Sequence, residues 1–215
     1  MKTIIKVCLA AIALFIGMNL HAQSPISYGI KAGVNLANFD IDGTDVVDDS
    51  DAKLGFNVGV TLDYAFTPEW YLLTGLEYTI KGAKFFDGNL KANLGYLQLP
   101  IHAGYKLEVA DNMKIVFHAG PYFAYGINGK YKDSDSEIGT DAFKKYLLEG
   151  GVGMYETLHK RFDFGAGAGV GAEFGKIGVG IGYDFGLVNT GGGAYDRRDE
   201  KVRNMNAYLT VGYKF

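Results

Sequence analysis

The residues that could do chemistry are few, and the histidines come first among them. His102 and His118 lie in segments where apolar and polar residues alternate, and both fall on the polar side. His159 lies near the end of a long connection. A Ser–His hydrolase needs a hydroxyl nucleophile beside such a base. The serines beyond residue 22 are Ser24, Ser27, Ser50, Ser134 and Ser136. The alternation of side chains along the predicted strands places none of these serines beside His102 or His118, so we expect both histidines to be packed inside the fold. We expect no catalytic residue and no enzymatic activity.

Metal and cofactor sites have little more support. The segment Asp40–Asp51 holds six aspartates and no basic residue. Clustered carboxylates suit Ca²⁺ or Mg²⁺, and bound ions could bridge this loop to the phosphates of lipopolysaccharide. The spacing does not match an EF-hand loop, so a solvated acidic loop is the favoured interpretation. The glycines of Gly171–Gly175 lie in a strand pattern and do not open a helix. We expect no bound metal and no cofactor.

The candidate residues lie on or between predicted β-strands, whose sequence pattern is clearest in the last segment, Asn206–Phe215. Its apolar residues fall on one face of a strand and its polar residues on the other. The apolar set is Ala207, Leu209, Val211, Tyr213 and Phe215. This pattern is typical of a transmembrane barrel strand, which faces lipid on one side and the lumen on the other. We expect the terminal Phe215 to be read by the machinery that inserts barrels into the outer membrane.

Alternation of this kind occurs eight times along the chain. The predicted strands are Ser27–Phe39, Leu54–Phe66, Trp70–Gly82, Tyr96–Leu107, Lys114–Ile127, Arg161–Phe174, Ile177–Leu187 and Asn204–Phe215. Short and long connections take turns between them, as periplasmic turns and outer loops do in outer-membrane barrels. A soluble, lipocalin-like barrel is the alternative, but the polar face here is too rich in glycine and too poor in charge. We therefore predict an all-β fold, an eight-stranded antiparallel up-and-down transmembrane β-barrel over residues 23–215.

Residues 1–22 have the features of a secretory signal peptide. Lys2 and Lys6 precede an apolar run from Val7 to Met18, and Ala22 suits a cleavage site. The run is short for a spanning helix, so a retained anchor is the weaker alternative. Cys8, the sole cysteine, lies too early in the run for a lipoprotein signal. The mature chain would therefore have no thiol and would reach the outer membrane.

Charge excludes one class of partner. Without Lys2 and Lys6, the 21 basic residues become 19, against 24 acidic ones. A chain with this acidic balance is not expected to bind nucleic acid, which requires a basic face.

The inward face of the predicted barrel carries nearly balanced charges. Its ionisable residues are Lys31, Lys81, Lys106 and Lys214 with Asp63, Glu77, Asp163, Glu173 and Asp184. Buried charges must be paired, so a packed, hydrogen-bonded plug is favoured over a narrow conduit. The glycine-rich wall should leave room for Tyr71, Tyr122 and Tyr208 from other strands.

Two loops have patterns of their own. Asp141–Glu149 places apolar residues at helical spacing behind a possible cap and predicts a short amphipathic helix in the longest loop. The fourth loop carries the basic residues Arg197, Arg198, Lys201 and Arg203. Because the first and last strands are neighbours in a closed barrel, we expect this cluster to pair with the acidic first loop.

Four motifs carry a family resemblance over essentially the whole mature chain. They are Gly29–Asn35 (GIKAGVN), Thr74–Gly82 (TGLEYTIKG), Tyr96–Ile101 (YLQLPI) and Val211–Phe215 (VGYKF). The chain resembles the PorT-like family of outer-membrane β-barrels. The resemblance implies an eight-stranded outer-membrane barrel, in a family whose founding member serves protein secretion.

The favoured function is a non-enzymatic barrel with a structural or interaction role that displays loops outside the cell. A subunit of an envelope or protein-secretion assembly is one form of it. The expected partners are outer-membrane lipid and lipopolysaccharide, the insertion machinery acting on Phe215, and an envelope protein. An enzyme that modifies outer-membrane lipids and a small pore are the alternatives.

Overall fold

The computed structural model describes residues 25–42, 50–85, 89–133, 140–147, 155–192 and 201–215. The predicted signal peptide, residues 1–22, lies outside this part. The strands are β1 (Ile26–Asp42), β2 (Ser50–Ala65), β3 (Trp70–Lys81), β4 (Ala83–Phe85), β5 (Leu90–Ala110), β6 (Met113–Asp133), β7 (Thr140–Asp141), β8 (Lys145–Leu147), β9 (Tyr155–Thr157), β10 (Phe162–Phe174), β11 (Ile177–Gly186) and β12 (Lys201–Lys214). No helix in the described residues is long and apolar enough to cross a membrane.

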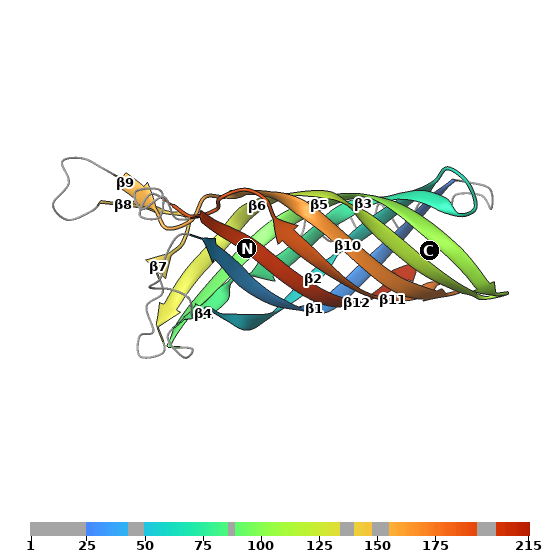
Figure 1. The fold of residues 1–215 in the computed structure, drawn as a ribbon, viewed down its shortest axis with the longest axis horizontal. Coiled ribbons are helices and arrows are strands. Elements are labelled where there is room, and N and C mark those ends of the chain that lie inside the picture. Colours follow the sequence, from blue (N-terminus) through green and yellow to red (C-terminus); the bar gives the residue numbers. More distant parts are fainter. Residues whose placement is uncertain (1–24, 43–49, 86–88, 134–139, 148–154, 193–200) are drawn as a thin grey trace.

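Eight long strands form a closed antiparallel ring (Figure 1). Each pairs with the next along the ring, β1–β2–β3–β5–β6–β10–β11–β12. The ring closes where β1 pairs with β12, from Gly29 opposite Lys214 to Asp42 opposite Lys201. The predicted all-β, eight-stranded barrel is confirmed.

The two ends of the barrel differ. The connections 66–69, 111–112 and 175–176 are short and lie together at one end, here called the turn end. The short strands β4, β7, β8 and β9 gather at the opposite end, here called the loop end (left in Figure 1). The loop-length pattern predicted from the sequence is therefore present, with the turn end expected in the periplasm.

Side chains alternate between the two faces of the wall, as the sequence indicates. Along β2, Phe56 and Val58 point outward and are about half exposed, whereas Asn57 between them is buried. An apolar outer face around a polar lumen is the arrangement that a barrel in lipid requires.

Toward the loop end this arrangement inverts. In β5, Ala92 and Leu94 point inward and are fully buried, while Lys91 points outward and is exposed. This part of the wall has an apolar interior and a polar exterior, as in a water-soluble barrel. Strands β5 and β6 have 21 residues each, about twice what a tilted strand needs to span the hydrocarbon. They therefore extend beyond the membrane-facing part of the barrel.

A β-bulge interrupts β6 where the inversion occurs. Gly95 lies opposite Asn128 and Tyr96 lies opposite Gly126, so Ile127 has no partner in the register. The extra residue changes which of the side chains that follow it face the interior and which face outward. Beyond it, Gly129 faces the interior and Lys130 is exposed.

The helix predicted over Asp141–Glu149 is wrong. Residues 140–141 form β7, which pairs with β6, and residues 145–147 form β8, which pairs with β9. The side chain of Asp141 accepts a hydrogen bond from the backbone N–H of Phe143 at 3.0 Å, which makes a turn. The extended β6 offers backbone groups for pairing, and Phe143 gains a buried position, so tertiary contacts override the helical spacing. Residues 148–149 lie outside the described part.

Glycines make room for large inward side chains, as predicted. A Cβ atom at Gly104 would lie 2.3 Å from the Tyr71 ring, and one at Gly182 would lie 2.3 Å from the Tyr208 hydroxyl. Tyr122 fills the space beside Gly165 in the same way. Each tyrosine lies directly opposite its glycine on the neighbouring strand, so its ring occupies the space that the missing side chain leaves on the inner wall.

Candidate functional site: the filled lumen

The lumen holds a fully buried ion pair where β3 ends and β10 begins, toward the loop end. Lys81, the last residue of β3, places its Nζ 3.0 Å from Oδ2 of Asp163, near the start of β10, and both side chains are at most 1% exposed. Asn204 of β12 donates to the same oxygen at 2.9 Å. The Lys81 ammonium also lies over the Tyr122 ring, 4.2 Å from its centroid. Four strands thus fix one pair of charges.

A second polar layer lies beside this pair. The amide nitrogen of Gln98 donates to Oε1 of Glu77 at 3.0 Å and to Oδ2 of Asp184 at 2.9 Å. Lys31 forms an ion pair with Glu77 at 2.5 Å. The amide separates two carboxylates that would otherwise repel each other, so this layer also holds the strands together.

The two predicted inward histidines meet in the middle of the barrel. The Nδ1 atoms of His102 and His118 are 2.9 Å apart, and the rings stack with centroids 5.1 Å apart. One ring must donate and the other accept, because each neutral imidazole carries one N–H. Neither described serine is bonded to them: Ser50 Oγ lies 3.3 Å from the backbone oxygen of Phe39, and Ser27 faces Asp63 across β1 and β2. No nucleophile–base pair forms among these residues.

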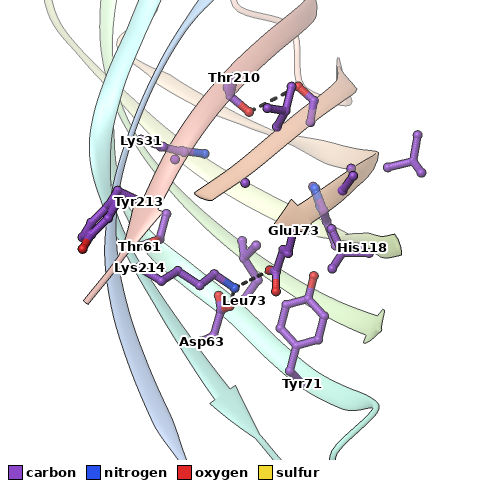
Figure 2. Close-up of a pocket in the computed structure, with 18 of the residues that line it drawn as sticks. Lys31, Thr61, Asp63, Tyr71, Leu73, His118, Glu173, Thr210, Tyr213 and Lys214 are labelled. Atoms are coloured by element: carbon purple, nitrogen blue, oxygen red, sulfur yellow. Dashed lines mark hydrogen bonds and ion pairs between the residues drawn. The ribbon is translucent and has the colours of Figure 1, made fainter. Parts of the chain in front are cut away.

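At the turn end the lumen opens into a cavity of about 110 Å³, and Figure 2 draws most of the residues that line it. Lys214 bridges Asp63 and Glu173, and Lys106 lies 3.5 Å from both carboxylates. Two ammonium groups and two carboxylates therefore balance one another. Tyr71 lies beside this cluster, with the Lys106 ammonium 4.5 Å from its ring centroid. The arrangement neutralises charge at the mouth and leaves room for a few water molecules.

The loop end is closed by an apolar cluster that the sequence did not reveal. Its buried members are Phe39, Ala83, Phe85, Ala92, Leu94, Tyr96, Tyr122, Ala124, Ala142, Phe143 and Val202. The Phe143 ring lies against Gly126 and Gly129, where added Cβ atoms would come within 3 Å of it. Arg161 covers its other side, 5.0 Å from the ring centroid. The connection after β7 therefore folds into the barrel mouth.

His159 joins three connections over this cluster. Its backbone N–H donates to Ala142, and its Nδ1 lies 3.0 Å from the backbone oxygen of Thr190. Its Nε2 lies 2.5 Å from the Tyr131 hydroxyl, and its ring stacks on Phe39 with centroids 5.2 Å apart. These contacts tie the segments 140–143, 158–160 and 189–192 into a cap, the name used for them below.

Burial sets the protonation state of this histidine. Loss of hydration lowers the pKa of His159 to about 4, although its bond to Thr190 and the charge of Asp163 act in the opposite direction. At neutral pH the ring is therefore uncharged. A neutral ring can donate from Nδ1 to the Thr190 carbonyl and accept from the Tyr131 hydroxyl, which satisfies both of its nitrogens.

The acidic first loop and the basic fourth loop meet in part as predicted. Arg203 Nη1 lies 2.7 Å from Oδ2 of Asp40, and Lys201 lies opposite Asp42 in the strand register. Arg197 and Arg198 lie outside the described residues, as does most of the acidic loop. In the described part of the chain, no group of three or more His, Cys, Asp or Glu side chains is arranged to hold a metal ion. The absence of a bound metal stays a prediction.

Comparison with known proteins agrees with the observed barrel. The family model described as outer membrane protein beta-barrel domain matches residues 21–191. No curated protein matches the chain. Among solved structures, the attachment invasion locus protein Ail of Yersinia pestis is 14% identical, covering 88% of this chain and 98% of that one, with a TM-score of 0.43.

Two further structures are similar to the same extent. Neisserial surface protein A is 13% identical over 87% of this chain and 97% of that one, with a TM-score of 0.48. The outer membrane protein OprG of Pseudomonas aeruginosa is 12% identical over 88% of this chain and 95% of that one, with a TM-score of 0.43. The family model covers most of the strands that form the ring described above. The chain therefore belongs to the family of outer membrane protein β-barrel domains.

Proposed function

We propose that the protein is a non-enzymatic outer-membrane barrel that presents a rigid platform of loops outside the cell. The observation that carries this proposal is the closed loop end, where Phe143 and His159 tie three connections to an apolar cluster inside the wall. A barrel with a closed mouth and an extended outer wall is suited to contact with a partner. A role as a subunit of an envelope or secretion assembly is the narrower form, supported by the PorT-like resemblance.

The two alternatives are less well supported by the geometry. A pore would need a continuous polar path, whereas the Lys81–Asp163 pair and the cap fill the lumen at two levels. A lipid-modifying enzyme would need a nucleophile or a base at the lipid-facing surface. His102 and His118 instead face each other inside the barrel.

The location and the other partners belong to the same proposal. We infer export through cleavage after Ala22, insertion through recognition of the strand that ends at Phe215, and contact with outer-membrane lipid and lipopolysaccharide. Phe215 suits a signal for the insertion machinery, because it is exposed and its backbone N–H closes the ring by donating to Tyr28 at 2.9 Å. No nucleic-acid partner is expected.

Copurification in mild detergent tests the interaction role. We expect a stoichiometric envelope protein to accompany the tagged barrel from outer-membrane fractions, and to be lost when the loop-end residues Tyr155–Thr157 of β9 are replaced by Gly-Ser-Gly. A variant with Gly-Ser-Gly at residues 110–112 of the turn end serves as the control and should keep the partner. Recovery of the barrel alone from every detergent tested would contradict the interaction role.

Planar bilayers test the pore. The wild-type protein should give no single-channel steps, because its cap and buried Lys81–Asp163 pair block the lumen. Regular steps from the wild-type protein would overturn the filled-lumen interpretation and restore the pore.

A further inference from the structure

A cluster of lysines lies on the outer wall near the loop end. Lys84 of β4 lies directly opposite Lys91 of β5, and Lys91 lies directly opposite Lys132 of β6. Lys130, two residues before Lys132, is exposed on the same face. These four residues are called the lysine patch. The neighbours of Lys84 and Lys91 in sequence, such as Phe85 and Ala92, point into the apolar cluster, so the lysines point outward.

The lysine patch is not explained by the stability of the fold. Like charges directly opposite each other across strands are destabilising. The strand register places Asp51 opposite Lys84 and Asp141 opposite Lys130, yet none of the four lysines forms an ion pair in the described part of the chain. Elsewhere in the barrel, by contrast, Lys114 of the turn end is paired with Glu108 at 3.5 Å. A row of unpaired, mutually repelling cations therefore suggests an anionic ligand.

The position of the lysine patch indicates which anion it meets. Going toward the loop end, the outward residues of β5 change from Leu97 to Asn93 and Lys91, and those of β6 change from Ile127 to Asn128 and Lys130. Strands rise about 3.3 Å per residue and tilt by about 45°, so the lysines lie about 7 to 14 Å beyond the last apolar residues. Lysine can also bend its charged end back along the wall. This is the level of the headgroups of the outer leaflet.

A hollow in the wall adjoins the lysine patch. It has a volume of about 450 Å³, and its polar lining is formed by Tyr78, Asn93, Asn128, Lys130, Lys132, Asp141 and Arg161, so that three cationic side chains outnumber one carboxylate. The Tyr78 hydroxyl donates to the Asn128 side chain at 3.1 Å, which fixes two of the lining groups relative to each other. Amide, hydroxyl and cationic groups together suit a ligand that carries both sugar hydroxyls and phosphate.

We propose that the lysine patch and the adjoining hollow bind the phosphate groups of a phosphorylated glycolipid in the outer leaflet. The proposal rests on the outer-membrane placement given under the proposed function and assigns its lipid contact to specific residues. The bound lipid neutralises the repulsion between Lys84, Lys91 and Lys132. It also holds the barrel at a fixed height, because the cations must stay level with the phosphates.

The test compares two double variants of the full-length mature protein in detergent micelles. The first is Lys91→Gln with Lys132→Gln, and the control is Lys114→Gln with Lys176→Gln, which removes the same charge at the turn end. The probe is bisphosphorylated lipid A in mixed micelles. Two surface lysines near an anionic headgroup layer lead us to expect a Kd about 30-fold weaker for the first variant. The control should bind like the wild type, and Lys91→Arg with Lys132→Arg should retain binding.

Two further measurements identify the ligand and distinguish a failure of this proposal from a failure of the proposed outer-membrane location. Lipid A stripped of its phosphates should bind the wild type no better than it binds the first variant. An unchanged Kd in the first variant would overturn the proposal, as would an effect seen only with heparin, which would mean a soluble sulfated polymer. Recovery of wild type and variants in outer-membrane fractions, with heat-modifiable migration, is scored separately. A wild type missing from those fractions would overturn the placement instead.

Discussion

The buried pair of Lys81 and Asp163 gives the sharpest prediction about stability. Replacing Lys81 with Met keeps the length of the side chain but removes its charge. Asp163, which is fully buried, then keeps only its hydrogen bonds to Asn204 and to the more distant Tyr122 hydroxyl at 3.4–3.5 Å. Removing one partner of a buried pair is costly because the remaining charge has no compensation.

The magnitude follows from the geometry. Opposite unit charges 3.0 Å apart attract by about 5 kcal/mol at an effective dielectric constant of about 20. Part of this attraction offsets the loss of hydration of the two groups. Measured losses on breaking buried pairs are about 3–5 kcal/mol, and we expect K81M to lower the free energy of unfolding by that amount. The double variant K81M/D163N should lose at least about 2 kcal/mol less than the sum of the two single variants.

Urea titration of the barrel in detergent micelles measures these free energies. Trp70 is the only tryptophan and reports unfolding by fluorescence, while the heat-modifiable band on gels gives the folded fraction. The control is K114M, because the Lys114–Glu108 pair is 3.5 Å long with side chains 40% and 62% exposed. Its loss should stay below about 1 kcal/mol. A cost for K81M no larger than that of K114M, or additive single variants, would refute the reasoning.

Three further outcomes are expected. Changing Phe215 to Asp should leave an exported chain that is degraded before insertion, and normal outer-membrane levels on Western blots would contradict this. Gly182→Ala should cost about 1–3 kcal/mol in the urea assay because its Cβ would meet the Tyr208 hydroxyl at 2.3 Å, whereas Gly178→Ala, whose nearest atom is 3.9 Å away, should be nearly neutral. Since the pKa of His159 is about 4 in the fold and about 6.5 unfolded, the unfolded chain binds more protons between these values. Stability should therefore fall as pH drops from about 6.5 to about 4, and His159→Gln should show a smaller fall than the wild type in parallel titrations.

Strand identity and side-chain direction could be read from the sequence, because alternation decides which face each residue takes. It placed His102, His118 and the lumenal charges on the inside. It could not say which charges meet, since Lys81 and Asp163 lie on strands that are far apart in the sequence and not neighbours in the ring. The balance of acidic and basic residues on the inward face indicates that ion pairs must form, and the geometry of the ring determines which residues form them.

The outer part of the barrel was harder to predict for two physical reasons. Strands β5 and β6 were expected to stop near Tyr96 and Ile127, yet they continue to Leu90 and Asp133. Beyond the membrane the apolar residues change from the outer face to the inner face, so the pattern of a lipid-facing strand ends there. The spacing of Phe143 and its apolar neighbours predicts a helix in the connection after β6, but the aromatic ring closes the mouth of the barrel instead. Removing residues 141–149 would take away the buried Phe143, so we expect it to lower the stability of the barrel.

The bulge at Ile127 changes which residues of β6 face the interior, from even-numbered to odd-numbered positions. On the turn side of it, even-numbered residues such as Tyr122 and Ala124 face the interior, and on the loop side odd-numbered residues such as Gly129 take their place. A regular ladder in which Ile127 took a paired position would turn every later side chain over. Lysines would then enter the apolar cluster while Tyr131 moved to the surface. The face that each later residue of β6 takes thus depends on Ile127 staying outside the ladder, whereas deletion of Ile127 would keep Gly95 opposite Asn128 and leave the outer wall unchanged.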